Sequence, residues 1–222
     1  MAYHPLLIDV ASRPCVVIGG GTVAERKVCA LLESGAEVTV ISPTVTATIR
    51  ELADDNKVTH RQRCYEEGDL KGSVIAYCAT NRRAVNQTIR SDAERAGVLL
   101  NVVDDPGLSD FISPALVRRG ALLLAVSSSG ACPVVARRIR ERLEVQFGEE
   151  YAPFMELVGA IRIKLLKKRG NSVNNIRIFE GLIDSPLLEW IREGRTAKID
   201  ALLHGLLGDG FGTSQLGIKI GK

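Results

Sequence analysis

The sequence has few of the residues that build disulfide frameworks, metal centres and base-stacking surfaces. Its five cysteines form no Cys-x-x-Cys pair and no close cluster, and its three histidines are scattered along the chain. We therefore expect neither a disulfide framework nor a protein-held metal site. Aromatic residues make up only 5% of the chain and do not alternate with basic ones, so we expect no nucleic-acid partner.

Long apolar runs are also missing. No run approaches the roughly 20 residues that cross a bilayer, and the first residues lack the basic and then apolar layout of a signal peptide. These observations predict a cytoplasmic protein that does not contact a membrane. The 222 residues, of which 45% are hydrophobic and 25% charged, suffice for one α/β core and a smaller appendage.

The charge is unevenly distributed along the chain. Residues 1–110 carry 12 Lys and Arg against 15 Asp and Glu, a net charge of −3, whereas residues 111–222 carry 17 against 11, a net charge of +6. The second half is therefore predicted to attract an anionic partner.

The most informative stretch is the run Pro14–Ala24, which reads as a buried strand, a glycine turn and the start of a helix over Val23–Leu32. In a dinucleotide-binding unit, Gly19 would make the turn and Gly21 would let the backbone approach a pyrophosphate. The helix N-terminus would offer its unpaired N–H groups to the phosphates. A purely structural turn is the alternative, because loops use glycine for many reasons.

Strands continue to alternate with helices up to Val103. We expect strands over residues 37–41, 58–61, 74–79 and 98–103, and helices over 46–53 and 83–96. This order predicts an α/β fold, a Rossmann-type parallel sheet with helices on both faces.

The alternation ends at Asp104. Phe111–Val117 and Leu122–Ser127 are expected to form a β-hairpin that turns at residues 118–121, with a helix from Pro133 to about Phe147 after it. Further helices are expected over 154–168, 176–183, 187–192 and 197–206, followed by a glycine-rich, poorly determined tail. The predicted regions are a dinucleotide-binding domain (1–110), a hairpin and helix (111–150) and a small helical domain (151–222).

Ligands of open parallel sheets bind beyond the carboxyl ends of the strands. The glycine turn, Ser42-Pro43-Thr44, Ala79-Thr80-Asn81 and Asn101–Asp104 should all meet there. The second strand ends without the Asp or Glu that usually receives the adenosine ribose, and no Arg follows to receive a 2′-phosphate. The spacing therefore does not decide between NAD and NADP.

Asp104 is the candidate catalytic residue. A carboxylate at the end of the fifth strand would face the nicotinamide crevice, where it could take a proton as hydride leaves the substrate. The alternative is that Asp104 only caps the Asp-Asp-Pro-Gly turn that begins there.

Arginines and serines follow in the second half of the chain. Arg118 and Arg137 belong to a group of arginines that could hold several carboxylates through paired N–H donors, or simply lie on a solvated face. Ser127 and Ser128 could bind an anion, line a substrate pocket, or cap the helix that starts at Pro133.

Taken together, these motifs resemble those of one known family. They are Val17–Lys27, Ala79-Thr80-Asn81, Val85-Asn86, Asn101–Asp104 and Ala125–Gly130. They are similar to those of siroheme synthase, and more narrowly to its precorrin-2 dehydrogenase/sirohydrochlorin ferrochelatase module. The resemblance is strong over residues 1–150 and weak over the helical remainder.

The resemblance implies oxidation of precorrin-2 to sirohydrochlorin with NAD, then insertion of Fe²⁺ to give siroheme. It implies that Asp104 is the essential aspartate and that the cofactor contacts Thr22-Val23 and Pro43-Thr44. Thr80 and Asn81 are further candidate cofactor contacts, and Asn101 joins the serines and arginines as a candidate substrate contact. A homodimer built through the hairpin and the helix after it is implied as well.

Relatives of this kind often carry a methyltransferase, for which the 222 residues have no room. A separate uroporphyrinogen-III methyltransferase is therefore expected upstream. Iron would be held mainly by the tetrapyrrole nitrogens, which is compatible with the lack of a Cys/His cluster. Two alternatives stay open: a dehydrogenase that leaves metal insertion to a separate chelatase, and a regulatory domain that senses NAD without turnover.

Overall fold

The computed structural model describes residues 3–169 and 173–220, and the chain divides into two compact units, Met1–Ser113 and Pro114–Lys222. The first boundary thus falls just after the one predicted at residue 110, and the two later predicted regions belong to one unit. The division of that second unit at residue 150 stays a prediction.

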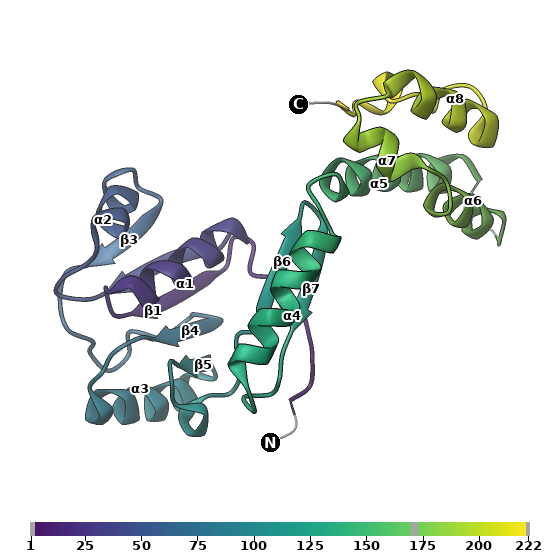
Figure 1. Ribbon diagram of the computed structural model, residues 1–222. Helices are drawn as coiled ribbons and strands as arrows, with labels where there is room; N and C mark the ends of the chain where they lie inside the picture. Colours follow the sequence, from purple (N-terminus) through teal and green to yellow (C-terminus); the bar gives the residue numbers. More distant parts are fainter. Residues whose placement is uncertain (1–2, 170–172, 221–222) are drawn as a thin grey trace. The chain divides into compact units, whose positions relative to one another are not determined.

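The first unit is built on a parallel sheet in the order β3-β2-β1-β4-β5 (Figure 1). Its strands are β1 (Pro14–Ile18), β2 (Glu37–Ile41), β3 (Val58–Arg61), β4 (Ile75–Cys78) and β5 (Leu99–Val102). Central strand β1 is apolar and buried from Cys15 to Ile18 because both faces of the sheet are covered. This arrangement confirms the predicted α/β, Rossmann-type sheet.

Helices cover the two faces of the sheet. On one face lie α1 (Thr22–Glu33) and α2 (Ala47–Asp54), which bury Val28 and Ile49 against β1 and β2. On the other lies α3 (Arg83–Ala96), which buries Ile89. The residue Gly97, at φ +66°, ends α3 in the left-handed conformation that glycine adopts without strain.

The connection from β3 to β4 carries no helix, yet it covers part of the α3 face of the sheet. Leu70 from this connection is fully buried in the same apolar cluster as Ile18 and Ile41, and Tyr65 packs against that cluster. A loop can occupy such a position only if its polar groups find partners there.

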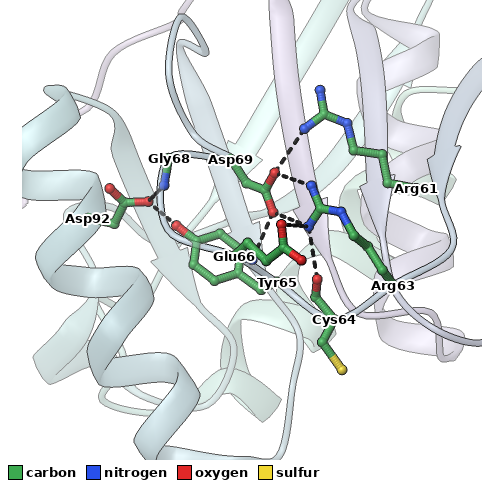
Figure 2. A network of polar contacts seen from close by, with 8 residues as sticks. All are labelled: Arg61, Arg63, Cys64, Tyr65, Glu66, Gly68, Asp69 and Asp92. Carbon is green, nitrogen blue, oxygen red and sulfur yellow. Dashed lines mark hydrogen bonds and ion pairs between the residues drawn. The ribbon is translucent and has the colours of Figure 1, made fainter.

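Two buried carboxylates supply those partners (Figure 2). Asp69 accepts two hydrogen bonds from the Arg63 guanidinium, at 2.7 and 2.6 Å, one from Arg61 at 2.9 Å, and one from the N–H of Glu66 at 2.9 Å.

Asp92 on α3 accepts hydrogen bonds from the Tyr65 hydroxyl and, at 2.8 Å, from the N–H of Gly68. Burial, followed by the hydrogen bond to Asp92, raises the pKa of Tyr65. Together the two carboxylates fasten the connection to the sheet and to α3.

The second unit opens with the antiparallel hairpin of β6 (Ala115–Arg119) and β7 (Leu122–Val126). The hairpin was predicted correctly, but the bounds of its first arm were wrong. Phe111 stays with the first unit, where its ring packs edge-on against Tyr77, and Pro114 has no N–H to pair. The chain instead turns at Gly120, whose φ of +55° suits a two-residue hairpin loop, so Arg118 and Arg119 are strand residues.

The described residues of this unit then form five helices: α4 (Pro133–Gln146), α5 (Tyr151–Arg169), α6 (Val173–Ile183), α7 (Leu187–Arg192) and α8 (Thr196–Leu207). The first of them, α4, packs on the hairpin. The other four share an apolar core around Leu157, Ile161, Leu182 and Leu203.

The tail was predicted to be poorly determined, but up to residue 220 it packs against the helical core. Phe211 is 1% exposed, and a 3₁₀ turn, η2 (Ser214–Leu216), follows it. Among residues 3–169 and 173–220, no helix is long and apolar enough to cross a membrane.

Candidate functional site

The three glycines after β1 meet three different surroundings. Gly19 has a φ of +118°, and a Cβ there would overlap the carbonyl oxygen of Ala79. A Cβ on Gly20 would overlap the carbonyl oxygen of Thr44 and lie 2.8 Å from the Ser42 hydroxyl. Gly21 has open space on its Cβ side. Roles in the turn were predicted from the sequence for Gly19 and Gly21 only. Among the three glycines, however, a Cβ would meet its nearest neighbouring atom at Gly20.

The amino terminus of α1 opens directly from this turn. Gly21 is the N-cap residue and supplies no side chain to cap the helix. The first hydrogen bond of the helix runs from the N–H of Glu25 to the Gly21 carbonyl. Within the described part of the chain, the N–H groups of Thr22, Val23 and Ala24 have no partner, and those of Thr22 and Val23, which are not buried, are free to bind an anion.

The loop after β2 lies against the glycine turn. The N–H of Thr46 donates to the Gly20 carbonyl at 3.0 Å, and the Ser42 hydroxyl donates to the Thr44 carbonyl at 2.7 Å. Pro43 and Thr44 are exposed beside the turn, as a cofactor contact requires. The Ser42 hydroxyl, where many dinucleotide-binding units have a carboxylate, is thus occupied by its own loop.

The loop after β4 is held by Asn86, a residue to which the sequence analysis assigned no role. Asn86 on α3 is 8% exposed, and its carboxamide oxygen accepts hydrogen bonds from the Thr80 hydroxyl at 2.5 Å and the Cys78 thiol at 3.1 Å. Its nitrogen donates to the Thr80 carbonyl at 3.3 Å. Burial raises the pKa of the Cys78 thiol. Thr80 is therefore fixed in place, while Asn81 beside it is exposed.

Asp104 stands at the carboxyl end of β5, next to the end of β4, because the N–H of Val103 donates to the Cys78 carbonyl at 2.9 Å. Its side chain is exposed and makes no hydrogen bond or ion pair with any residue that the structure describes. The capping role considered for Asp104 belongs instead to Asp105, whose carboxylate accepts the N–H of Gly107 at 3.1 Å.

Asn101, a candidate substrate contact, is buried on the α1 side of β5. Its side-chain nitrogen donates to the Phe111 carbonyl at 2.8 Å. Beside it, the Lys27 ammonium lies 4.9 Å from the centre of the Tyr77 ring and donates to the Ser113 hydroxyl at 2.9 Å. Burial lowers the pKa of Lys27 and raises that of Tyr77. Asn101 thus anchors the segment that leaves the first unit, and its contact with substrate stays a prediction.

The four remaining candidates belong to the second unit. The Ser127 hydroxyl accepts the N–H of Ser129 at 3.0 Å, and the Ser128 hydroxyl accepts the N–H of Cys132 at 3.1 Å, immediately before α4. Arg137 forms an exposed ion pair with Glu141 at 3.4 Å, and Arg118 is exposed on β6. Their role in substrate binding stays a prediction.

The carboxyl edge of the sheet therefore gathers the glycine turn, Pro43-Thr44, Thr80-Asn81 and Asp104. The order β3-β2-β1-β4-β5 places the switch point of the topology between β1 and β4, where such sheets bind ligands. With respect to residues 3–169 and 173–220, N–H groups without a partner lie on one side of this point, and a carboxylate without a partner lies on the other. These features define a dinucleotide-binding protein of the Rossmann type.

Comparisons with known proteins agree with this class. A family described as "Putative NAD(P)-binding" matches residues 6–115. The siroheme synthase of Nitrosococcus oceani is 36% identical over 216 residues, 97% of this chain and 46% of that protein. The siroheme synthase of Photobacterium profundum is 40% identical over 167 residues, 75% of this chain and 36% of that protein. The chain thus spans less than half the length of these relatives.

A solved structure is similar over nearly its whole length. "SirC, precorrin-2 dehydrogenase" is 27% identical to this chain with a TM-score of 0.75, and the match covers 92% of this chain and 98% of that one. The chain belongs to the family of the siroheme synthase N-terminal module.

Proposed function

We propose that this protein oxidises precorrin-2 to sirohydrochlorin with NAD as the oxidant. The observation that carries the proposal is the shared sheet edge, on which a phosphate-binding turn and an unpaired carboxylate, Asp104, lie at the ends of neighbouring strands. The likeness to a precorrin-2 dehydrogenase along nearly all of that protein's length supports the same substrate.

The residues after β1 fit a bound dinucleotide. Gly21 leaves open space beside the turn, and the free N–H groups of Thr22 and Val23 would hold the pyrophosphate. Pro43 and Thr44 would line the adenosine side, and Thr80 and Asn81 the side nearer Asp104. When bound, NAD would supply an acceptor for hydride.

Asp104 would take the proton that accompanies hydride loss from the tetrapyrrole. Loss of one hydride and one proton leaves a new double bond in the substrate, which balances the two-electron oxidation. Because Asp104 has no partner among the described residues, both of its carboxylate oxygens are available to the substrate. Arg118 and Arg137, with the hydroxyls of Ser127 and Ser128, would receive substrate carboxylates.

The test is to incubate the protein with precorrin-2 and NAD and to follow sirohydrochlorin by its absorbance. Asp104→Asn should abolish the reaction while leaving the dissociation constant of NAD within about twofold, because the phosphate-binding turn is untouched. A domain that only senses NAD would show no oxidation in either protein, and full activity of Asp104→Asn would refute the role of Asp104.

Iron insertion is a second candidate activity, favoured by the high similarity to proteins named siroheme synthase. Fe²⁺ would be a substrate here, and Asp104 would collect the protons that the metal displaces from the macrocycle. Protein given sirohydrochlorin and Fe²⁺ without NAD should then form siroheme faster than the protein-free mixture. An unchanged rate would leave a dehydrogenase that depends on a separate chelatase.

We also propose a homodimer built through the second unit. Apolar side chains are exposed on the hairpin and on α4: Leu116, Val134, Val135, Ile139 and Val145. Light scattering of the purified protein should give twice the mass of 24.0 kDa. We further expect a cytoplasmic location, since all five thiols are free, and a separate methyltransferase that supplies precorrin-2.

A further inference from the structure

Asp104 occupies an unusual place in the backbone. The N–H of Asp105 donates to the Val102 carbonyl at 3.2 Å, so that residues 102–105 form a tight turn with Asp104 in its third position. Asp104 has a φ of +64°. In a turn of this shape the third position favours glycine or asparagine, because L side chains are strained at positive φ. A strained residue persists only where its surroundings hold it.

The Ser109 hydroxyl, which lies outside this turn in the sequence, forms hydrogen bonds with the backbone of its first and last residues. It accepts the N–H of Val102 at 2.9 Å and donates its single proton to the Asp105 carbonyl at 2.8 Å, with the Val102 carbonyl at 3.1 Å as a second acceptor within reach. One side chain therefore joins the residues at the two ends of the turn that contains Asp104.

The residue after Ser109, Asp110, is bonded to the same strand. Strand β5 lies at the edge of the sheet, so the N–H groups of Leu100 and Val102 point away from β4 and need other partners. The Asp110 carboxylate accepts the N–H of Leu100 at 2.9 Å, and the N–H of Asp110 donates to the Leu100 carbonyl at 2.8 Å. Arg90 from α3 holds the other carboxylate oxygen of Asp110 at 2.6 Å. Residues 109–110 thus line the open edge of β5.

We infer that Ser109 is a positioning residue for Asp104. The inference rests on the proposed oxidation of precorrin-2. Because the Asp104 side chain has no hydrogen bond or ion pair among the described residues, its direction is set mainly by the backbone of the turn. Ser109 is the side chain that bonds to both ends of that turn, so its loss would let the carboxylate move away from the reacting position.

The experiment compares Ser109→Ala with Ser109→Thr and with the matched control Ser113→Ala. Ser113 is a nearby serine whose hydroxyl contacts Lys27 and not the turn. In Ser109→Ala, kcat for precorrin-2 oxidation should fall about tenfold or more, since small misplacements of a reacting group are costly. The KM for NAD should stay within about twofold. Ser109→Thr should restore most of kcat, and Ser113→Ala should match the wild type.

Hydrogen exchange of the Val102 N–H gives a readout that needs no activity. Its protection should drop in Ser109→Ala and persist in Ser109→Thr and Ser113→Ala. Unchanged protection in Ser109→Ala would overturn the inference, as would wild-type kcat in a variant that has lost this protection. If the wild-type protein itself does not oxidise precorrin-2, the proposed function fails. The role of Ser109 in positioning a base for that reaction then fails as well, even if hydrogen exchange shows that Ser109 holds the turn.

Discussion

Gly20 and Thr44 meet backbone to backbone, and any side chain on Gly20 would overlap the Thr44 carbonyl oxygen. This contact joins the glycine turn to the loop after β2, the two segments expected to hold the cofactor. We therefore expect Gly20 to be needed for folding of the site, and Gly21, which has open space beside it, to be needed mainly for the ligand.

Gly20→Ala and Gly21→Val should separate these two roles. Gly20→Ala should lower the free energy of unfolding by about 1–3 kcal/mol through overpacking. Gly21→Val should lower that free energy by no more than about 1 kcal/mol, because valine is a poorer N-cap residue than glycine but the backbone there is extended and its surroundings are open. It should nevertheless raise the dissociation constant of NAD about tenfold or more by blocking approach of the pyrophosphate. Urea unfolding measures the free energy of unfolding, and calorimetric titration measures the dissociation constant of NAD. Unchanged NAD affinity in Gly21→Val would mean that the pyrophosphate lies elsewhere.

A trade-off between stability and activity is expected at Asp104. Asp104→Gly should be at least as stable as wild type, because glycine adopts a φ of +64° without strain. Asp104→Ala should be less stable than Asp104→Gly by about 1 kcal/mol. Both should lack precorrin-2 oxidation. Thermal unfolding of the three proteins checks the order, and an Asp104→Ala protein more stable than Asp104→Gly would contradict the strained backbone.

Much of the first unit follows from sequence, because its signals are local. The buried strand before Gly19, the alternating pattern of residues 37–41 and the stop at Gly97 each determine an element without reference to the rest of the chain. The hairpin was harder to place. Phe111 is as apolar as a strand residue, but its packing on Tyr77, far away in sequence, keeps it in the first unit.

The sequence predicted which loops meet at the candidate site, but not most of the contacts that hold these loops together. Parallel strands bring their carboxyl ends to one edge, so the meeting of the glycine turn with Pro43 and Thr80 follows from topology. The roles of Gly20, Asn86 and Ser109 depend on hydrogen bonds and close approaches between segments, which no local pattern encodes. A polar residue one turn away from a buried apolar residue of the same helix, as Asn86 is from Ile89, was the one available signal.

Asn86 should support both folding and cofactor binding. Asn86→Ala would leave the Thr80 hydroxyl and the Cys78 thiol without their acceptor, and should lower the free energy of unfolding by about 1–3 kcal/mol. It should also weaken NAD binding, since the loop that carries Thr80 and Asn81 loses its anchor. Thr88→Ala, on the exposed side of the same helix, is the control. Wild-type NAD affinity in a folded Asn86→Ala protein would separate this loop from the cofactor site.

The buried carboxylate of Asp69 should make stability depend on pH in the acid range. The hydrogen bonds from Arg63 lower the pKa of Asp69 in the folded protein. A group whose folded pKa is depressed contributes stability that is fully present above its unfolded pKa, about 3.9 for Asp, and is lost as pH falls through the folded pKa. Asp69→Asn should therefore lower the urea midpoint at pH 7, and its difference from wild type should stay constant down to about pH 4 and shrink below it.

Asp55→Asn, which breaks only the exposed ion pair with Lys57, should change the midpoint little at any pH. A difference between Asp69→Asn and wild type that is the same at pH 3 and pH 7 would show that the ionised carboxylate does not hold the connection between β3 and β4.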